Sequence, residues 1–130
     1  MLENSKAYSG FAVDHLKKAQ QFYGGTLGLK TEVIDEENGL MTLHLAGDRP
    51  TLVYQQQGAT PASYTILNFP VDDIDETVDE LARRGVSFER YDAMEQDEKG
   101  IARGLAAGRG PDIAWFKDPA GNVLSVLQES

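Results

Sequence analysis

The sequence predicts an α+β fold in which two βαβββ modules, residues 1–57 and 63–130, build one domain of 130 residues. An internal repeat and two turn signals carry this prediction. The turn signals are Asn38-Gly39, typical of a hairpin, and Asp118-Pro119-Ala120-Gly121, typical of a type I turn. The repeat pairs residues at one constant spacing: Phe11 with Phe69, Val13 with Val71, Asp14 with Asp72, and Leu16 with Ile74.

The first module contains one amphipathic helix among short apolar segments. Its helix begins after Asp14, a favourable capping residue, and Gly24 and Gly25 are expected to end it. Met41, Leu43 and Leu45 alternate with polar residues, as in a half-buried strand. The predicted strands are residues 10–13, 29–34, 40–45 and 51–55, and the predicted helix is residues 15–23.

A polar link, residues 56–62, separates the modules, and the second module then repeats the order of the first. Asp73 and Glu76 have the spacing of a capping box, and Gly85 is expected to end the helix that carries Ile74, Val78 and Leu81. The predicted strands are residues 64–71, 86–91, 112–117 and 122–128. Residues 92–110 form a long, charged, glycine-rich loop, which is typical of a functional or mobile segment.

Composition excludes several classes of function. The net charge of −9 argues against nucleic acid and anionic membranes as partners and favours a cationic ligand, although solubility alone also explains it. The chain has no cysteine, which excludes disulfides and thiolate ligands and agrees with a cytoplasmic location. It has no apolar run that would span a bilayer and no signal-peptide pattern.

Two motifs resemble a known family. Residues 13–23 with Leu27-Gly28-Leu29 resemble the V-x-D-L-x-x-A-x-x-F-Y…L-G-L start of a vicinal oxygen chelate module, with the Asp one place early. Residues 116–122 resemble the F-x-D-P-x-G-N turn before the last strand of that family. The chain is therefore identified as a member of the glyoxalase/bleomycin resistance/dioxygenase superfamily. The resemblance implies an open cup of two curled sheets with the helices outside, and a homodimer.

Many members of the family bind a divalent metal with one His, Glu or Gln from the first and last strand of each module. The corresponding positions here are Tyr8, Ile66, Ser125 and, within one residue, Val53. Because these side chains are poor ligands for a divalent cation, we expect no metal and no other cofactor. This expectation argues against the metal-dependent activities of the family.

Strand alternation assigns residues to the inside of the implied cup. We expect Phe11, Val13, Leu67, Phe69, Leu124 and Val126 to pack under the helices, and the inward positions, Val53 among them, to be mostly apolar. Such a lining fits a small-molecule pocket or a side-chain-filled interior. The candidate ligand-binding residues are Tyr8, Gln55, Tyr64, Ile66, Asn68, Arg103, Trp115 and Ser125.

Three sets of residues have both a functional and a structural interpretation. His44 is the candidate general base by residue type, and an exposed surface histidine is the alternative. Asp97, Glu98, Lys99 and Arg103 belong either to a lid over the cup or to a mobile, solvated loop. Trp115 either packs in the sheet or an interface, or stacks on a planar ligand.

Two functions follow from the sequence. The first is binding or sequestration of a small molecule without metal, as in the bleomycin-resistance branch, where a cationic drug lies in grooves between subunits. The second is a lyase, isomerase or dioxygenase with an unusual metal site or with acid–base chemistry by His44 or a loop carboxylate. A fold alone does not decide between them.

Overall fold

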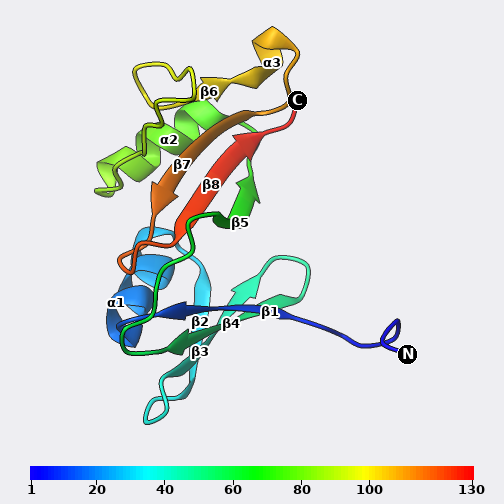
Figure 1. Ribbon diagram of the computed structural model, residues 1–130, viewed down its shortest axis with the longest axis vertical. Coiled ribbons are helices and arrows are strands. Elements are labelled where there is room, and N and C mark those ends of the chain that lie inside the picture. The colour runs from blue at the N-terminus through cyan, green and yellow to red at the C-terminus, as the bar shows by residue number, and fades with distance from the viewer. The chain divides into compact units, whose positions relative to one another are not determined.

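The computed structural model describes all 130 residues and confirms the α+β fold. The chain divides into two compact units, Met1–Thr60 and Pro61–Ser130. Each unit has one four-stranded mixed sheet (Figure 1). None of the helices combines the length and the apolar character that crossing a bilayer requires.

Unit 1 has the strand order β1-β4-β3-β2, in which β1 runs parallel to β4 and the other neighbours are antiparallel. Its first eight residues are exposed and extend from β1 to the N-terminus (Figure 1). The elements are β1(Ser9–Val13), α1(Leu16–Gln20), the π-helical turn η1(Gln21–Thr26), β2(Lys30–Asp35), β3(Leu40–Leu45) and β4(Arg49–Gln55).

The core of unit 1 lies between its sheet and α1. Met41, Leu43 and Val53 are fully buried, and Val53 is the cross-strand neighbour of both Phe11 and Met41. Phe11 contacts the buried Tyr23 with ring centroids 5.6 Å apart. Val53 therefore lies on the helix-covered face, and its predicted inward position is wrong. Burial of side chains of this size contributes about 1.5–3 kcal/mol each.

The first helix begins and ends later than the sequence predicts. His15, not Asp14, is the N-cap, and its Nδ1 accepts a hydrogen bond from the Lys18 N–H at 3.4 Å. The chain then continues through Gly24 and Gly25 as η1, whose wider turn brings the Leu27 N–H to the Phe22 carbonyl at 2.9 Å. Gly24 and Gly25 do not have a positive φ. The glycine with a left-handed conformation after this helical segment is Gly28, at φ 75°.

Unit 2 has the strand order β5-β8-β7-β6, with β5 parallel to β8. Ile74, Val78 and Leu81 of its main helix are buried, as the apolar stripe predicts. Asp73 is the predicted N-cap and accepts from the Glu76 N–H at 3.0 Å. The elements are β5(Thr65–Pro70), α2(Ile74–Arg83), β6(Ala102–Arg103), α3(Gly104–Ala107), β7(Asp112–Lys117) and β8(Val123–Gln128).

In each unit, a glutamine from the last strand accepts a hydrogen bond from the first residue of the main helix. Gln55 Oε1 accepts from the Leu16 N–H at 2.8 Å, and Gln128 Oε1 accepts from the Ile74 N–H at 2.9 Å. Each bond satisfies one main-chain donor that a helix leaves unpaired at its start. Gln55 is thus occupied at the helix, and its predicted place on the opposite face of the sheet is wrong.

The predicted strand 86–91 is the main error in unit 2. Only Phe88 bridges to Phe116, and the Glu89 N–H donates to the Trp115 carbonyl at 2.8 Å. The chain then leaves the sheet and returns as β6, where Ala102 lies opposite Ile113. A continuous strand would place residue 91 opposite Ile113, so 11 residues, the difference between 102 and 91, are inserted in this edge of the sheet. We call residues 91–101 the excursion.

Candidate functional site

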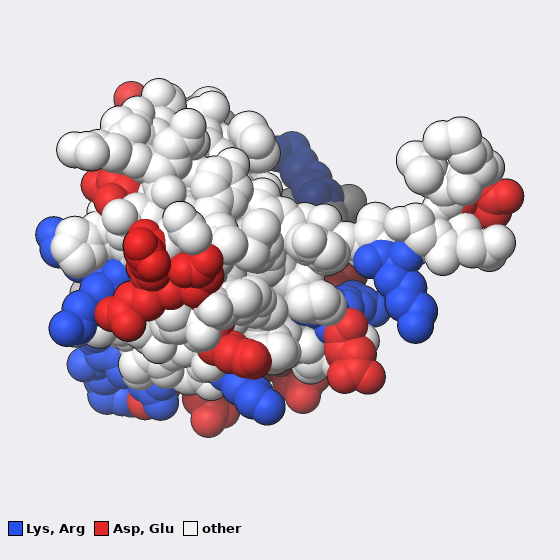
Figure 2. Space-filling model, turned by 90° about the horizontal axis from the view of Figure 1, so that it is seen from below, with Lys and Arg blue, Asp and Glu red and all other residues white.

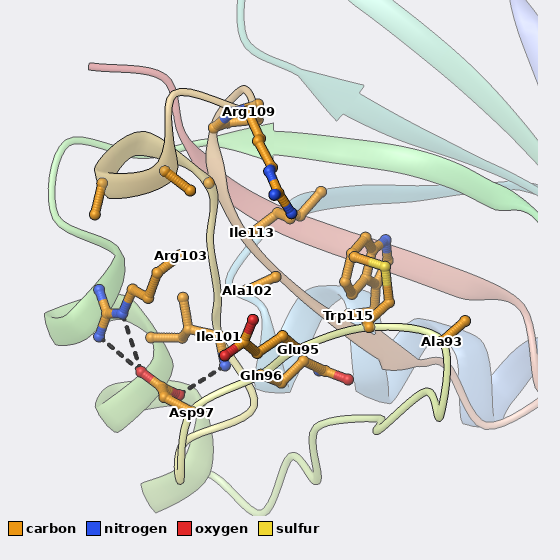
Figure 3. Close-up of a pocket in the computed structure, with 15 residues that line it drawn as sticks. Ala93, Glu95, Gln96, Asp97, Ile101, Ala102, Arg103, Arg109, Ile113 and Trp115 are labelled. Carbon is orange, nitrogen blue, oxygen red and sulfur yellow. Dashed lines mark hydrogen bonds and ion pairs between the residues drawn. The ribbon is translucent and has the colours of Figure 1, made fainter.

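A pocket of about 850 Å³ lies in unit 2, beside the excursion. Its walls are the excursion, β6, α3 and the loop that follows α3, and Ile113 and Trp115 of β7 contribute its apolar side (Figure 3). These two residues alternate with Ala114 and Phe116, which are buried. Because side chains alternate along a strand, Ile113 and Trp115 project from the sheet face opposite to α2.

Gln96 holds the excursion in place. Its Oε1 accepts from the Tyr91 N–H at 2.8 Å, and its Nε2 donates to the Glu89 and Gly100 carbonyls at 3.0 and 2.7 Å. One side-chain amide therefore satisfies main-chain groups at both ends of a segment that has left the sheet. Such groups otherwise need partners in a neighbouring strand or in water.

An ion-pair network ties the excursion to α2. Arg103 donates to both oxygens of Asp75, at 2.7 and 3.0 Å, and to Asp97 at 3.0 Å, and its guanidinium lies 3.6 Å from Asp112. Lys99 pairs with Asp75 and with Asp79 on the same helix. In Figure 3 the guanidinium of Arg103 is directed at Asp97, away from Trp115 and Arg109.

The network shifts the pKa values of its members. Hydrogen bonds from Arg103 lower the pKa of Asp75 from 3.8 to about 2, and those with Asp75 and Asp97 raise the pKa of Arg103. Asp79 and Asp75 raise the pKa of Lys99. Burial opposes ionisation of Asp97, but hydrogen bonds from the Ile101 and Lys99 N–H groups and from Arg103 lower its pKa overall. All four groups remain charged at neutral pH, as a fixed anchor requires.

Trp115 is the centre of the apolar part of the pocket. It is half-buried, and Tyr91 packs edge-on against it with ring centroids 5.5 Å apart and an interplanar angle of 77°. Met94 and Ile113 also line the pocket. The chain contains no other tryptophan. An aromatic ring held by a neighbouring ring and flanked by apolar side chains is suited to contact a flat ligand.

Two charged side chains line the pocket without partners. In Figure 3, Arg109 extends from the loop after α3 toward Ile113, and the carboxylate of Glu95 points toward Ala102. Neither side chain forms a hydrogen bond or an ion pair, whereas Arg103 is fully engaged. The pocket therefore offers one free cation and one free anion beside an apolar surface.

Three predicted ligand-binding residues form one cross-strand row. Ser125 lies opposite both Asn68 and Trp115, and its Oγ donates to Asn68 Oδ1 at 2.6 Å. Trp115 and Arg103 also line the pocket, while Asn68 and Ser125 do not. Ser125 is fully buried.

The other predicted site residues lie outside this pocket. Tyr8 and Tyr64 precede the first strands of their units and are exposed, and Ile66 lies at the register shift in β5. His44 is on the surface of β3, where its Nε2 lies 3.6 Å from Oε2 of Glu32. Whether any of these residues binds a ligand stays a prediction.

The donor set at the positions implied for a metal does not fit a divalent cation. Ile66 and Val53 are apolar, Val53 is buried under α1, and the Ser125 hydroxyl is hydrogen-bonded to Asn68. No group of three or more His, Cys, Asp or Glu side chains in either unit is placed to hold a metal. Cation binding needs several carboxylate or imidazole ligands, and these positions lack them.

Sequence reasoning missed Glu95, Gln96 and Arg109. Alternation along β7 was sufficient to place Ile113 beside Trp115, but nothing in the glycine-rich loop marks which side chains turn toward them. The signal that was available is the length of the loop, which marks the second module as different from the first.

The sequence profile of the Glyoxalase/Bleomycin resistance protein/Dioxygenase superfamily matches residues 7–126. The two repeated units have the sheet topology expected of such a protein, and the chain belongs to this superfamily. No curated protein matches the sequence.

Solved structures confirm the fold along the whole chain. The chain is similar to an antibiotic-binding protein from Streptomyces sp., with 22% identity, a TM-score of 0.68 and 98% of each chain covered. It is similar to a member of the superfamily from Sphaerobacter thermophilus, with 23% identity, a TM-score of 0.66, and 95% and 97% covered. It is also similar to the fosfomycin resistance protein FosX from Mesorhizobium loti, with 14% identity, a TM-score of 0.64, and 98% and 93% covered.

The face of the molecule in Figure 2 carries both acidic and basic side chains, and basic groups lie beside acidic ones.

Proposed function

We propose that this protein binds a small organic molecule in the pocket of unit 2 and does so without a divalent metal. The observation that carries the proposal is the pocket of about 850 Å³ in which Trp115 and Ile113 form an apolar surface beside unpaired charges. Small-molecule sites have this volume and this mixture of an apolar lining with few polar groups.

The fold neighbours support the proposal. One of them is an antibiotic-binding protein and another is a fosfomycin resistance protein, so the same fold serves proteins whose names point to small molecules. The apolar or hydrogen-bonded side chains at Val53, Ile66 and Ser125 support the metal-free part of the proposal.

Calorimetry and NMR test the proposal together. The protein is treated with a chelator, its metal content is checked by elemental analysis, and it is titrated with the flat aromatic probes proflavine and 2-naphthoate. A single tryptophan gives a single indole N–H resonance, which reports from the pocket itself. We expect heat of binding and a shift of this resonance for at least one probe. No heat with either probe at high concentration contradicts the proposal, as does binding that needs added metal.

A matched pair of variants locates the site. Trp115→Leu removes the aromatic surface, and we expect about twofold to tenfold weaker binding because an aromatic contact contributes about 0.5–1.5 kcal/mol. Tyr54→Leu removes an exposed ring of unit 1 and is the control. Equal affinities of the two variants exclude the unit 2 pocket as the site.

Acid–base catalysis is the second candidate. It is supported by His44 and Glu32, a histidine–carboxylate pair on β3 and β2. Turnover of a glyoxalase or dioxygenase substrate that is lost in His44→Ala supports this candidate, and turnover unchanged in His44→Ala removes it. The homodimer implied by family membership remains a proposal, and sedimentation at micromolar concentration tests it.

A further inference from the structure

We infer that the pocket of unit 2 is specific for an amphoteric aromatic molecule: a flat ring with an acidic group at one end and a basic group at the other. This inference rests on the proposed function and adds the chemical class of the ligand.

The strand that forms the apolar side of the pocket indicates where the aromatic ring of the ligand would lie. Trp115 is half-buried on a regular strand, and Tyr91 fixes its orientation by an edge contact. Its remaining surface faces a space that Ile113 and Met94 also line. A flat aromatic ring matches this surface better than a branched or polar one because it buries the most area against another ring.

Arg109 is the reason for expecting an acidic group on the ligand. Every other charged group of the network near the pocket is paired: Arg103 with Asp75 and Asp97, and Lys99 with Asp79. Arg109 has no such partner and extends toward Ile113 (Figure 3). A guanidinium donates two parallel hydrogen bonds to a carboxylate, so the free cation selects a planar acid.

The basic group follows from Glu95. Its carboxylate lines the same pocket, points toward Ala102 and does not pair with Arg109 (Figure 3). A purely anionic ligand would meet this carboxylate and the overall charge of −9, both of which repel it. A ligand with a basic group at its second end pairs with Glu95, and because its two charges cancel, the overall negative charge does not repel it.

Four naphthalene probes test this inference, since they share one ring and differ in their ends. They are naphthalene-2-methanol, naphthalene-2-carboxylate, 2-naphthylmethylammonium and 6-(aminomethyl)naphthalene-2-carboxylate. Affinities are measured by calorimetry, and the Trp115 indole resonance confirms the location. We expect the probe with both groups to bind about tenfold more tightly than the neutral alcohol, since each exposed ion pair contributes a factor of about three to five.

Two variants that replace a charged side chain by a neutral one test which end of the probe each side chain binds. Arg109→Gln should weaken the two probes with a carboxylate about threefold to fivefold and leave the other two unchanged. Glu95→Gln should do the same to the two probes with an ammonium group. Glu98→Gln, in the same excursion, and Arg49→Gln, in unit 1, are the matched controls.

The outcomes separate this inference from the proposed function. If none of the probes gives heat or moves the indole resonance, the proposed function itself fails. If the neutral alcohol binds as tightly as the amphoteric probe, and neither Arg109→Gln nor Glu95→Gln changes the order, the pocket stands and the amphoteric class is refuted. If only Arg109→Gln has an effect, the ligand class is aromatic acids, which also refutes the inference as stated.

Discussion

Replacement of Gln96 tests whether one side-chain amide holds the excursion and thereby the pocket. Its three hydrogen bonds reach the Glu89 and Gly100 carbonyls and the Tyr91 N–H, and the two bonds to the carbonyls are partly buried. A hydrogen bond contributes about 0.5–1.5 kcal/mol net, with the lower end for exposed bonds. Gln96→Ala should therefore destabilise unit 2 by about 2 kcal/mol.

Gln96→Glu separates hydrogen-bond donation from side-chain size. The carboxylate still accepts from the Tyr91 N–H, but it cannot donate, and it places a negative oxygen against the Glu89 and Gly100 carbonyls. We expect this nearly isosteric change to cost at least as much as Gln96→Ala at pH 8. Protonation of the new carboxyl restores one donor, so its folded-state pKa is raised, and the difference from the wild type should shrink as the pH falls toward 4.

Urea unfolding followed by the fluorescence of Trp115 measures these changes in unit 2 alone, because unit 1 contains no tryptophan. Hydrogen exchange at the Tyr91 amide should accelerate in Gln96→Ala, which removes its acceptor, and less in Gln96→Glu, which keeps it. Ser63→Glu is the control, since it adds the same charge at an exposed side chain of unit 2. A loss below 0.5 kcal/mol in Gln96→Ala, on the scale of a typical surface substitution, would refute the reasoning.

Three further changes have defined outcomes. Asp75→Asn should cost about 1 kcal/mol of unfolding free energy at pH 7, a value discounted because the side chain is 46% exposed. The carboxylate of Asp75 contributes stability above pH 3.8 that is lost as the pH falls through about 2. The urea midpoints of the variant and the wild type should therefore converge in acid. Gln128→Leu and Gln55→Leu should each cost about 1 kcal/mol by circular dichroism in urea, and a much larger effect in one alone would contradict their equivalence as helix caps. Gly39→Ala should cost about 2 kcal/mol or more, because a Cβ at Gly39 would lie 2.7 Å from Cβ of Gln55 with φ at 69°, and an unchanged thermal midpoint would contradict this.

The fold was largely predictable from residues that repeat. Met41 and Leu43 alternate with polar residues on β3, and the structure gives this strand the predicted bounds. The D-P-x-G-N turn is equally local: the Gly121 N–H donates to the Asp118 carbonyl at 3.0 Å, and Asp118 Oδ1 accepts from the Asn122 N–H at 2.8 Å. Such features depend only on neighbours in sequence, so one sequence is enough to predict them.

The site was less predictable because its contacts are not local. The residues around Gln55 do not indicate that its side chain reaches the start of α1, 39 residues away, instead of the opposite face of the sheet. The available signal was Gln128, which occupies the same place in the second module. The two modules have different interiors, so a glutamine that both share indicates a structural role rather than a role in ligand binding. Arg103 was expected to contact a ligand; it lines the pocket, and its guanidinium is also paired with three aspartates that are distant in sequence.

The difference between the modules leads to the last prediction. Gln55 and Gln128, and Gly28 and Gly85, serve the same structural purpose in both units, whereas β2 is one strand of six residues and its counterpart is split by the excursion. The register shows how to undo this split. Deletion of residues 91–101 joins residue 90, opposite Ala114, directly to Ala102, opposite Ile113, and so restores a continuous strand.

The deletion variant should fold and lose the site. It gives up the buried Ile101 and the bonds of Gln96, and it gains an uninterrupted edge strand, as β2 is in unit 1. We expect a cooperative urea transition with a strand-rich circular dichroism spectrum, and at least tenfold weaker binding of any ligand that shifts the Trp115 resonance. Binding within twofold of the wild type would show that the excursion does not form the site. Failure to fold would show that the excursion, with its anchor between Lys99 and Asp79, is part of the structure that the second module cannot lose.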